Sequence, residues 1–428
     1  MLDFYQKFTG AAYNISRPLW NIWSRLEGKE SMWHGRLGQI PKEVLDKGPP
    51  DIWLQAVSVG EVAVAEAILQ AIDKRNAGLN ILVSSSTPTG FARAVSTFGK
   101  RFPIIPYPID FPQVVSRMAS LLRPRVYACL ETELWPNLIG AVRSFGAKTL
   151  LINGRISSRS FPRYMKLRPI TVPILSGFSR ICAISETHRE RLLALGASAD
   201  KTFVTGNAKY EALLSRPSPG KAEAMQKKLD LHDSQRIFVA GSLRKGEEEQ
   251  MGSICSSLLE SCEDAVAVLV PRHPKRVSLF EKALKSRKIP YQLWSRLQIG
   301  EPRKARVLVV DMIGPLYDLY SVATVSFVGG SLIPKGGQNL MEPASWACPV
   351  LFGPYTDNFE DARIALEKEG GGREVAGAHD LYKELLCLFE NPEQRKIMGD
   401  SAKTALANIA QRAASKQAEA LLEVLKGP

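Results

Sequence analysis

Short apolar segments alternate with longer amphipathic segments along most of the chain. Each apolar segment ends in a polar or glycine-rich turn, and the segment that follows is rich in alanine, valine and leucine. Strands alternating with helices at this spacing predict parallel sheets covered by helices on both faces. The expected strands are residues 52–57, 79–84, 101–107, 126–130, 149–152, 180–184 and 203–204, then 236–240, 265–270, 305–310, 324–328 and 349–352.

The alternating pattern is interrupted at residues 216–233. This segment, RPSPGKAEAMQKKLDLHD, has the Ser, Pro, Gly and Lys content of an interdomain linker and includes a polar helix. A chain of 428 residues is also too long for one ordinary core. We therefore expect two doubly wound, Rossmann-like domains, at residues 36–215 and 216–428, after a helical segment at 1–35. The alanine-rich residues 401–425 are expected to be helical and to pack back across both halves.

The N-terminal segment has apolar residues at alternating steps of three and four, the spacing of one helix face. Lysine, arginine and asparagine fall off this face, and tyrosine and tryptophan broaden it. A basic, aromatic and amphipathic helix is typical of a segment that lies in a membrane interface. The alternative is a helix docked on its own domain, with Pro18 kinking or splitting it. We expect neither a signal peptide nor a membrane-spanning segment here. The apolar stripe consists of Phe4, Phe8, Ala11, Ile15, Leu19, Ile22 and Leu26.

The charge balance is basic, with 56 Lys and Arg against 43 Asp and Glu and a net charge of +13. This excess favours anionic partners, but it does not distinguish among nucleic acid, phosphorylated substrates and an anionic membrane face. The six cysteines are scattered, form no CxxC pair and have no histidine cluster near them. This usage favours free thiols in a reducing compartment and argues against a zinc site.

Chemically active side chains are concentrated in the turns that follow the expected strands. The carboxyl ends of parallel strands share one edge of a sheet, so two such edges facing each other predict an interdomain cleft. The first half supplies carboxylates and a lysine to its edge, and the second supplies arginine, glycines and the pair Asn339 and Glu342. This division fits an acceptor bound in one half and a phosphorylated donor bound in the other.

Residues 326–359 carry the most informative turn, a glycine-rich loop between a buried strand and a helix. Glycines ahead of a helix leave backbone N–H groups open to an anion. Asn339 stands at the expected N-cap, and Glu342 follows at the spacing of a capping box. The alternative is that the glycines only form a tight loop and the two polar residues only cap the helix.

The candidate catalytic residues also have alternative interpretations. Glu61 is spaced to cap its helix through Ser58, or to accept a proton from a substrate hydroxyl. Glu131 and Glu133 could form a metal pair, although no DxD motif or His partner accompanies them. Lys209 could pair with a phosphate or be solvated. These alternatives are left open by spacing alone.

Taken together, the turn motifs resemble the 3-deoxy-D-manno-octulosonic acid (Kdo) transferases of lipid A assembly. The resemblance covers the chain from about Pro18 to Asp361. The motifs that carry it are, in order, SVGE at 58–61, ETELWPN at 131–137, INGR at 152–155, GNAKY at 206–210, AGS at 240–242 with GEEE at 246–249, PRHPKR at 271–276, GGSLIPKGGQNLMEPA at 329–344 and PVLFGPYTDNF at 349–359.

The resemblance implies a GT-B fold and a metal-independent, inverting transfer of Kdo from CMP-Kdo to a lipid A precursor of the lipid IVA type. It implies that Glu61 is the proton acceptor and that Glu131 and Lys209 stabilise the transition state. It also implies a peripheral or N-terminally anchored enzyme on the cytoplasmic face of the bacterial inner membrane, with no cofactor, no metal and no nucleic-acid partner. The implied CMP-binding residues are Pro271, Arg272, Ile313, Gly314, Pro315, Asn339, Leu340, Met341 and Glu342.

The chain departs from the family pattern in the second half. Residues 243–245, Leu-Arg-Lys, stand where the family more often has Thr-His-Glu, so the contacts of this turn are left open. Gln338, Pro315 and Met341 also replace residues common in the family. Two alternatives remain: another GT-B enzyme that uses a UDP-sugar, and a non-catalytic basic protein of membrane surfaces or nucleic acid. The acids at strand ends and the dispersed basic residues disfavour the second alternative. The number of Kdo residues added and the oligomeric state are not predicted.

Overall fold

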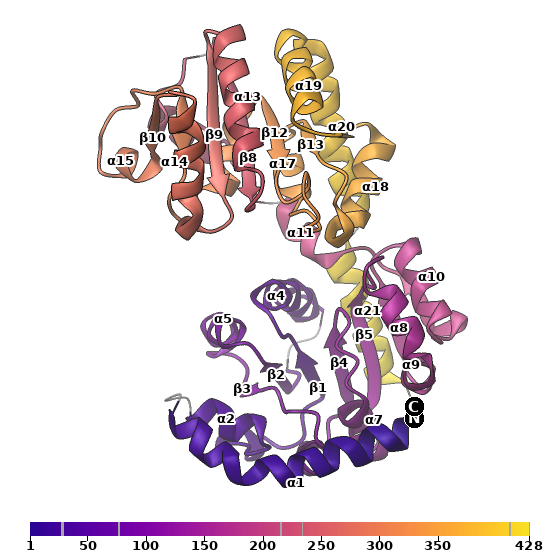
Figure 1. Cartoon of the computed structure of the whole chain (residues 1–428). Coiled ribbons are helices and arrows are strands. Elements are labelled where there is room, and N and C mark those ends of the chain that lie inside the picture. Colours follow the sequence, from indigo (N-terminus) through magenta and orange to yellow (C-terminus); the bar gives the residue numbers. More distant parts are fainter. Residues whose placement is uncertain (27–29, 76–77, 215, 233, 411, 428) are drawn as a thin grey trace. The chain divides into compact units, whose positions relative to one another are not determined.

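The computed structural model describes residues 1–26, 30–75, 78–214, 216–232, 234–410 and 412–427, with the side chains of 17–19 and 21–31 left out (Figure 1). The chain forms two compact units. Unit 1 comprises Met1–Glu211 with Ala410–Pro428, and unit 2 comprises Ala212–Ile409.

Unit 1 contains a parallel sheet of seven strands in the order β3-β2-β1-β4-β5-β6-β7. The order reverses between β1 and β4, which is the switch point where doubly wound sheets bind their ligands. The predicted strands of the first half are therefore confirmed. Their bounds are β1 Ile52–Gln55, β2 Ile81–Ser85, β3 Ile104–Pro106, β4 Val126–Leu130, β5 Lys148–Gly154, β6 Arg180–Ala183 and β7 Thr202–Val204.

Helices cover both faces of this sheet, as the continuous apolar character of its central strands requires. They are α4 Val59–Asp73, α5 Pro88–Phe98, α6 Pro112–Leu122, α7 Pro136–Ser144, α8 Phe161–Lys166, α9 Arg168–Leu175, α10 Glu186–Ala194 and α11 Ala208–Leu214, with the short α2 Glu30–Arg36 and α3 Lys42–Leu45 near the N-terminus.

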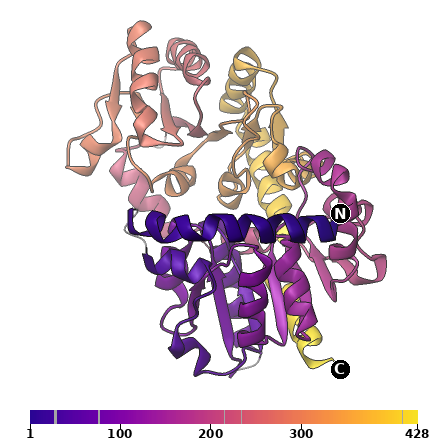
Figure 2. The same cartoon turned by 60° about the horizontal axis from the view of Figure 1, so that its bottom comes forward.

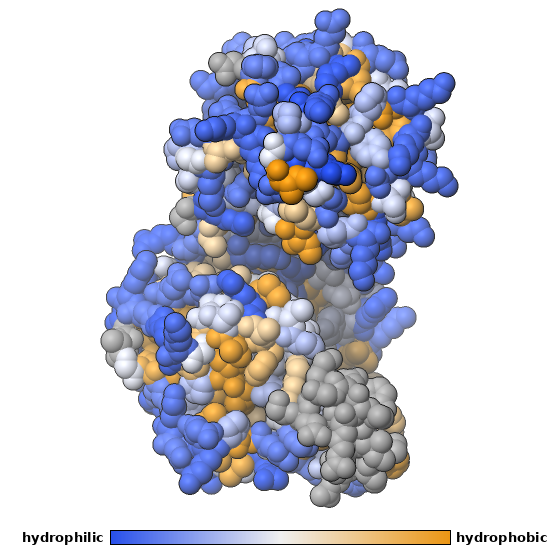
Figure 3. All heavy atoms as spheres, turned by 90° about the vertical axis from the view of Figure 1, so that its left-hand side faces the viewer, coloured by the Kyte–Doolittle hydropathy of each residue, from blue (hydrophilic) through white to orange (hydrophobic). Residues whose placement is uncertain are grey.

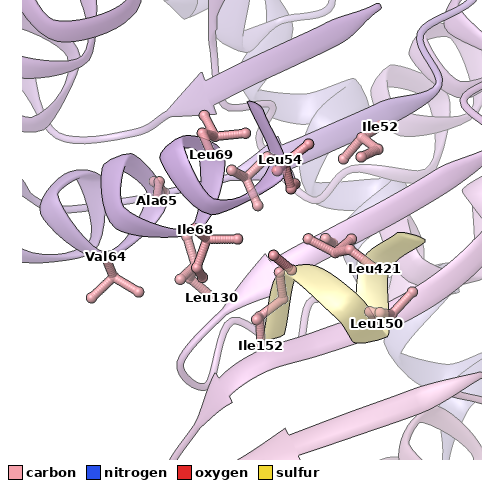
Figure 4. Close-up of a cluster of buried hydrophobic side chains, with 14 of the residues drawn as sticks. Ile52, Leu54, Val64, Ala65, Ile68, Leu69, Leu130, Leu150, Ile152 and Leu421 are labelled. Carbon is pink, nitrogen blue, oxygen red and sulfur yellow. The ribbon is translucent and has the colours of Figure 1, made fainter. Parts of the chain in front are cut away.

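The helix α21, Ala413–Lys426, completes one face of unit 1 although it comes from the end of the chain. Its Leu421 is fully buried and points toward Leu150 and Ile152 of β5 (Figure 4). The amide of Gln417 donates to the hydroxyl of Thr205 at 3.1 Å, at the end of β7. The apolar face of α21 therefore closes the same core against which α4 packs.

Unit 2 contains a second parallel sheet of seven strands, in the order β10-β11-β9-β8-β12-β13-β14. The five predicted strands are confirmed, whereas the edge strands β10 and β14 are not predicted, because each has only three residues and none of them is buried. The bounds are β8 Arg236–Leu243, β9 Ala265–Pro271, β10 Tyr291–Leu293, β11 Val307–Val309, β12 Val325–Val328, β13 Val350–Phe352 and β14 Gly372–Glu374.

The helices of unit 2 flank this sheet, and the first is the polar helix expected within residues 216–233. It contributes Met225 and, just beyond its end, Leu229 to a buried cluster with Trp294. The helices are α12 Pro219–Lys228, α13 Glu248–Ser261, α14 Val277–Ser286, α15 Trp294–Gln298, α16 Leu316–Leu319, α17 Met341–Ser345, α18 Glu360–Glu369, α19 Ala378–Glu390 and α20 Pro392–Ala410.

The N-terminal helix α1, Leu2–Leu26, lies along the outside of unit 1 (Figure 2). Its tyrosines face the unit: Tyr5 donates to the buried carboxylate of Asp110 at 3.0 Å, and the Tyr13 ring packs on Phe111. Asp110 also accepts from two backbone N–H groups at the start of α7. The helix continues through Pro18, so of the alternatives considered for Pro18 the splitting of the helix is wrong.

The apolar stripe of α1 faces away from unit 1 where its side chains are described. Phe4, Phe8 and Ile15 are 72%, 64% and 77% exposed. Leu19, Ile22 and Leu26 belong to the stretch whose side chains are left out. Elsewhere, Figure 3 shows a face on which hydrophilic residues surround separate hydrophobic groups, the ordinary mixture of a folded surface. Within the part of the chain that the structure describes, no helix is both long and apolar enough to cross a membrane.

Candidate active site

Glu61 lies in the first turn of α4 and is 6% exposed. Its backbone N–H donates to Ser58 Oγ at 3.3 Å, and the Ser58 hydroxyl donates to Glu61 Oε1 at 2.9 Å. The other carboxylate oxygen accepts from the backbone N–H of Val57 at 2.9 Å. The capping role of Glu61 is therefore confirmed, and the capping contacts hold the carboxylate in one position.

The same carboxylate has an unusual protonation equilibrium. Burial raises the pKa of Glu61 from 4.5 to about 7, the negative charge of Glu131 adds to the effect, and the hydrogen bonds from Val57 and Ser58 oppose it. A carboxylate with a pKa near 7 is suited to accept a proton from a hydroxyl group at neutral pH. Capping and proton transfer are thus compatible in this residue.

Glu131 follows β4 directly and has a left-handed backbone, with φ of 57°. Such a conformation costs a non-glycine residue about 1–3 kcal/mol and is often found at functional sites. Its carboxylate lies 3.9 Å from the Arg155 Nε atom. Glu133 has a different partner: its carboxylate accepts from the Trp135 indole N–H at 2.6 Å. Burial raises the pKa of Glu133 as well.

Lys209 lies near Glu61 because of the turn after β7. The backbone N–H of Ala208 donates to Asn153 Oδ1 at 3.0 Å, which ties the start of α11 to the end of β5. The ammonium group of Lys209 reaches the first turn of α4. Its Nζ atom would lie 4.0 Å from a Cβ atom placed on Gly60, the residue before Glu61. Unit 1 therefore brings together Glu61, Glu131 and Lys209, the three residues that the resemblance implies for catalysis.

In unit 2, the glycine-rich loop after β12 is held by the fully buried Glu247. Its carboxylate accepts from the backbone N–H groups of Gly330 at 2.8 Å, Leu332 at 3.3 Å and Arg244 at 2.8 Å. These hydrogen bonds offset part of the cost of burying the carboxyl group, whose pKa burial raises. Glu247 therefore occupies the N–H groups of Gly330 and Leu332, so these two groups of the loop are not open to an anion.

The helix after this loop begins later than predicted. Helix α17 starts at Met341, so Leu340 rather than Asn339 precedes it. Asn339 Oδ1 still accepts from the Met341 N–H at 3.2 Å, and its amide donates to Glu342 Oε1 at 3.2 Å. The side chains of Leu340 and Met341 are fully buried. Only their backbone is left to contact a ligand, whereas Asn339 and Glu342 retain partial exposure.

Positive charge gathers at the carboxyl ends of the adjacent strands β8 and β9. The backbone N–H of Arg272 donates to Leu243 O at 2.8 Å, which places Arg244 and Arg272 in neighbouring turns. Burial and the charges of Arg272 and Arg276 lower the pKa of the Arg244 guanidinium. The pKa of His273 is lowered by burial and by the same three arginines. This concentration of guanidinium groups favours an anionic ligand.

The remaining implied CMP-binding residues occupy the same edge of the sheet. Pro271 ends β9 and is buried, and Ile313, Gly314 and Pro315 form the turn between β11 and α16. Ile313 is 80% exposed and Gly314 has a φ of 128°. Because β11, β9, β8 and β12 are neighbours in a parallel sheet, their carboxyl ends lie at one edge.

Sequence reasoning assigned no role to Arg155 or Glu247. Both belong to motifs that carry the resemblance, INGR and GEEE, so their signal was present. Arg155 approaches Glu131 from the end of β5. Gly330, which donates to Glu247, is 83 residues away from it in the sequence, and no local pattern reveals such a contact.

Comparison with known proteins shows the family to which the chain belongs. Residues 31–212 match the family model for "3-Deoxy-D-manno-octulosonic-acid transferase (kdotransferase)". A 3-deoxy-D-manno-octulosonic acid transferase of Haemophilus influenzae is 30% identical over 82% of this chain and 82% of its own length. The chain belongs to the Kdo transferase family. It is a glycosyltransferase.

One further relative and one solved structure are also similar to this Kdo transferase. A bifunctional glycosyltransferase/methyltransferase of Fusobacterium nucleatum is 33% identical over 78% of this chain, which spans only 52% of that relative's length. The crystal structure of a glycosyltransferase from Rickettsia africae matches 89% of this chain and 100% of its own, with a TM-score of 0.61 at 15% identity. At that identity the likeness concerns the fold alone, and the two doubly wound sheets have the GT-B fold.

Proposed function

We propose that this Kdo transferase transfers Kdo from CMP-Kdo to a lipid A precursor of the lipid IVA type, in lipopolysaccharide inner-core synthesis. The observation that carries the proposal is the carboxylate of Glu61, which has a pKa of about 7 and is held next to Glu131 and Lys209. Transfer to a lipid hydroxyl needs one group that accepts a proton at neutral pH. Glu61 is positioned by its own helix to serve as that group.

In the proposed reaction, Glu61 accepts the proton of the acceptor hydroxyl as its oxygen attacks the anomeric carbon of Kdo. The bond between that carbon and the CMP phosphate oxygen breaks, CMP leaves with the bonding electrons, and the configuration is inverted. Positive charge develops on the sugar, and the carboxylate of Glu131 offsets it. Lys209 contributes a positive charge near the reacting groups. No metal is assigned a role in these steps.

The donor is proposed to bind to unit 2. Arg272 would contact its phosphate, since guanidinium groups form charge-assisted hydrogen bonds to phosphate oxygens. Glu342 would accept from the ribose hydroxyls, and the start of α17 would face the phosphate. Pro271, the turn at 313–315 and the backbone at 339–341 complete the proposed site.

The acceptor is proposed to reach unit 1 from a membrane surface. The outward stripe of α1 leaves Phe4, Phe8 and Ile15 mostly exposed, with the rings of Phe4 and Phe8 stacked on each other, as in helices that lie in a membrane interface. The net charge of +13 favours an anionic surface. We therefore propose peripheral attachment to the cytoplasmic face of the bacterial inner membrane.

A transfer assay tests this function. The purified full chain is supplied with detergent-solubilised lipid A precursor and with CMP-Kdo generated in situ, and the product is analysed by mass spectrometry. One or more additions of the Kdo mass are expected. No addition by a protein that still binds CMP would refute the acceptor assignment. Transfer from a UDP-sugar with no binding of CMP would favour the other GT-B reaction.

A further inference from the structure

Unit 1 has a groove of about 410 Å³ beside the acidic residues of the candidate active site. Its walls come from the turn after β4, from α8 and α9, and from the first turn of α1. Glu133 lines one part of it, two residues after Glu131. The groove therefore lies next to the place where the acceptor hydroxyl would lose its proton.

The lining of the groove is mainly apolar. Trp135, Tyr164, Leu167 and Ile170 all contribute to it. Trp135 and Leu167 remain 39% and 48% exposed, which is high for large apolar side chains beside a catalytic edge. The volume lies within the range of about 300–1,000 Å³ found for small-ligand sites and is too small for a folded partner. An extended alkyl chain suits both its size and its lining.

Basic side chains lie beside this apolar lining on one wall. Arg163 and Lys166 on α8 are exposed next to Tyr164 and Leu167, and residues 155–185 contain no Asp or Glu. Their charges complement an anionic headgroup rather than a neutral one. Tyr5 of α1 also lines the groove, so the N-terminal helix borders it.

We propose that this groove binds one acyl chain of the acceptor lipid, with the anionic headgroup of that lipid against Arg163 and Lys166. The inference rests on the proposed function, because it takes the acceptor to be a phosphorylated lipid. Binding of the chain fixes the depth at which the headgroup sits beside the acidic cluster, and so it positions the acceptor hydroxyl. The groove thereby selects an acylated acceptor over a free sugar phosphate.

Steady-state kinetics test the groove through Leu167→Glu, with Leu121→Glu as the matched control. Leu121 is also a half-exposed leucine of unit 1, on α6, and does not line the groove. Leu167→Glu should raise KM for the lipid acceptor about tenfold or more, because a charge replaces apolar surface. Its kcat and its KM for CMP-Kdo should stay near those of the wild type. An unchanged acceptor KM would overturn the proposal while leaving the function intact.

A binding measurement separates failure of the groove from failure of the function. A brominated lysophosphatidic acid, kept below its micelle concentration, carries one acyl chain and one phosphate and quenches nearby tryptophan. It should quench the wild-type protein, and the saturable part should be lost in Trp135→Phe and weakened in Leu167→Glu but not in Leu121→Glu. Equal quenching in all four proteins would refute the groove. Saturable quenching without Kdo transfer would refute the proposed function and retain a lipid-binding groove.

Discussion

Ser58 and Glu61 are joined by two hydrogen bonds, from the Ser58 hydroxyl to Glu61 Oε1 at 2.9 Å and from the Glu61 N–H to Ser58 Oγ at 3.3 Å. The pair begins α4 and also immobilises a carboxylate with a pKa of about 7. A general base gains from this arrangement, because its orientation is set before substrate arrives. The structural and chemical roles of Glu61 are thus parts of one local geometry.

Glu61→Gln should abolish transfer and leave the protein folded. Glutamine can keep the cap, because its oxygen can accept from the Val57 N–H while its amide group donates to the Ser58 hydroxyl. It cannot accept the proton, and loss of a general base typically lowers kcat about 10²–10⁴-fold. The Tm at pH 8 should not fall, since the variant no longer buries a charge. Glu66→Gln on the same helix is the control, because Glu66 lies at the surface of α4 beside Arg93. Turnover by Glu61→Gln at the wild-type rate would leave this residue with only its capping role.

The rate of transfer should depend on pH through the ionisation of Glu61. Only the ionised carboxylate accepts a proton, so kcat should decrease about tenfold per pH unit below the pKa of about 7. Glu133→Gln should move this acidic limb to lower pH, because the charge of Glu133 helps to raise the pKa of Glu61. A pH–rate profile that is flat between pH 5.5 and pH 8 would contradict the assignment of the base.

The same pKa shift has a defined effect on stability. The folded protein retains the Glu61 proton between pH 4.5, the ordinary pKa, and about pH 7, where an unfolded chain has lost it. This group therefore lowers the free energy of unfolding as pH rises through that window. Thermal denaturation should show a smaller loss of Tm between pH 5 and pH 8 for Glu61→Gln than for the wild type. A larger loss in the variant would reverse the sign of the argument.

Glu247→Gln should destabilise unit 2 and weaken donor binding. The amide can accept at one oxygen only, so at least one of the N–H groups of Gly330, Leu332 and Arg244 loses its partner. An unpaired buried donor costs about 1–3 kcal/mol. Thermal unfolding and calorimetric titration with CMP measure the two effects. Glu249→Gln is the matched control, since Glu249 is largely exposed and pairs with Arg287. Equal effects of the two substitutions would rule out a special role for the buried carboxylate.

Arg244→Leu should weaken the binding of CMP by about tenfold, because it removes one charge from the group with Arg272 and Arg276. The loss should shrink at high ionic strength, as expected of an electrostatic contribution. Arg287→Leu removes a positive charge at the end of α14 and serves as the control. An affinity for CMP that is unaffected by Arg244→Leu would limit the anion site to the arginines of the PRHPKR motif.

The double substitution Phe4→Ser and Phe8→Ser should reduce sedimentation of the protein with anionic phospholipid vesicles. Both rings are exposed, so the change removes apolar surface without opening the core of unit 1. Transfer to an acceptor in detergent micelles should be affected less than transfer to an acceptor in vesicles. Unchanged binding to vesicles would assign membrane contact to another surface.

The central strands of both sheets were predictable because their burial leaves a continuous apolar signal in the sequence. The edge strands β10 and β14 lack it. The tyrosines of α1 also differ from expectation, since Tyr5 and Tyr13 are expected to broaden the apolar stripe but face Asp110 and Phe111. At the site, the cap at Glu61 followed from spacing. Lys209 lies 148 positions after Glu61 in the sequence and approaches α4 from the turn after β7. No local pattern encodes this approach.

The late position of α21 in the chain has a consequence for biosynthesis. A nascent chain that has reached residue 409 contains all of unit 2 but lacks the helix that covers β5 and contacts α4. The loop before Lys209 also lacks two hydrogen bonds until Gln417 is made, because the amide of Gln417 donates to Thr205 and to Gly206. All of unit 2 is therefore made before α21, so the unit that begins first is completed last. The turn before Lys209 gains its contacts with Gln417 only after α21 has been made.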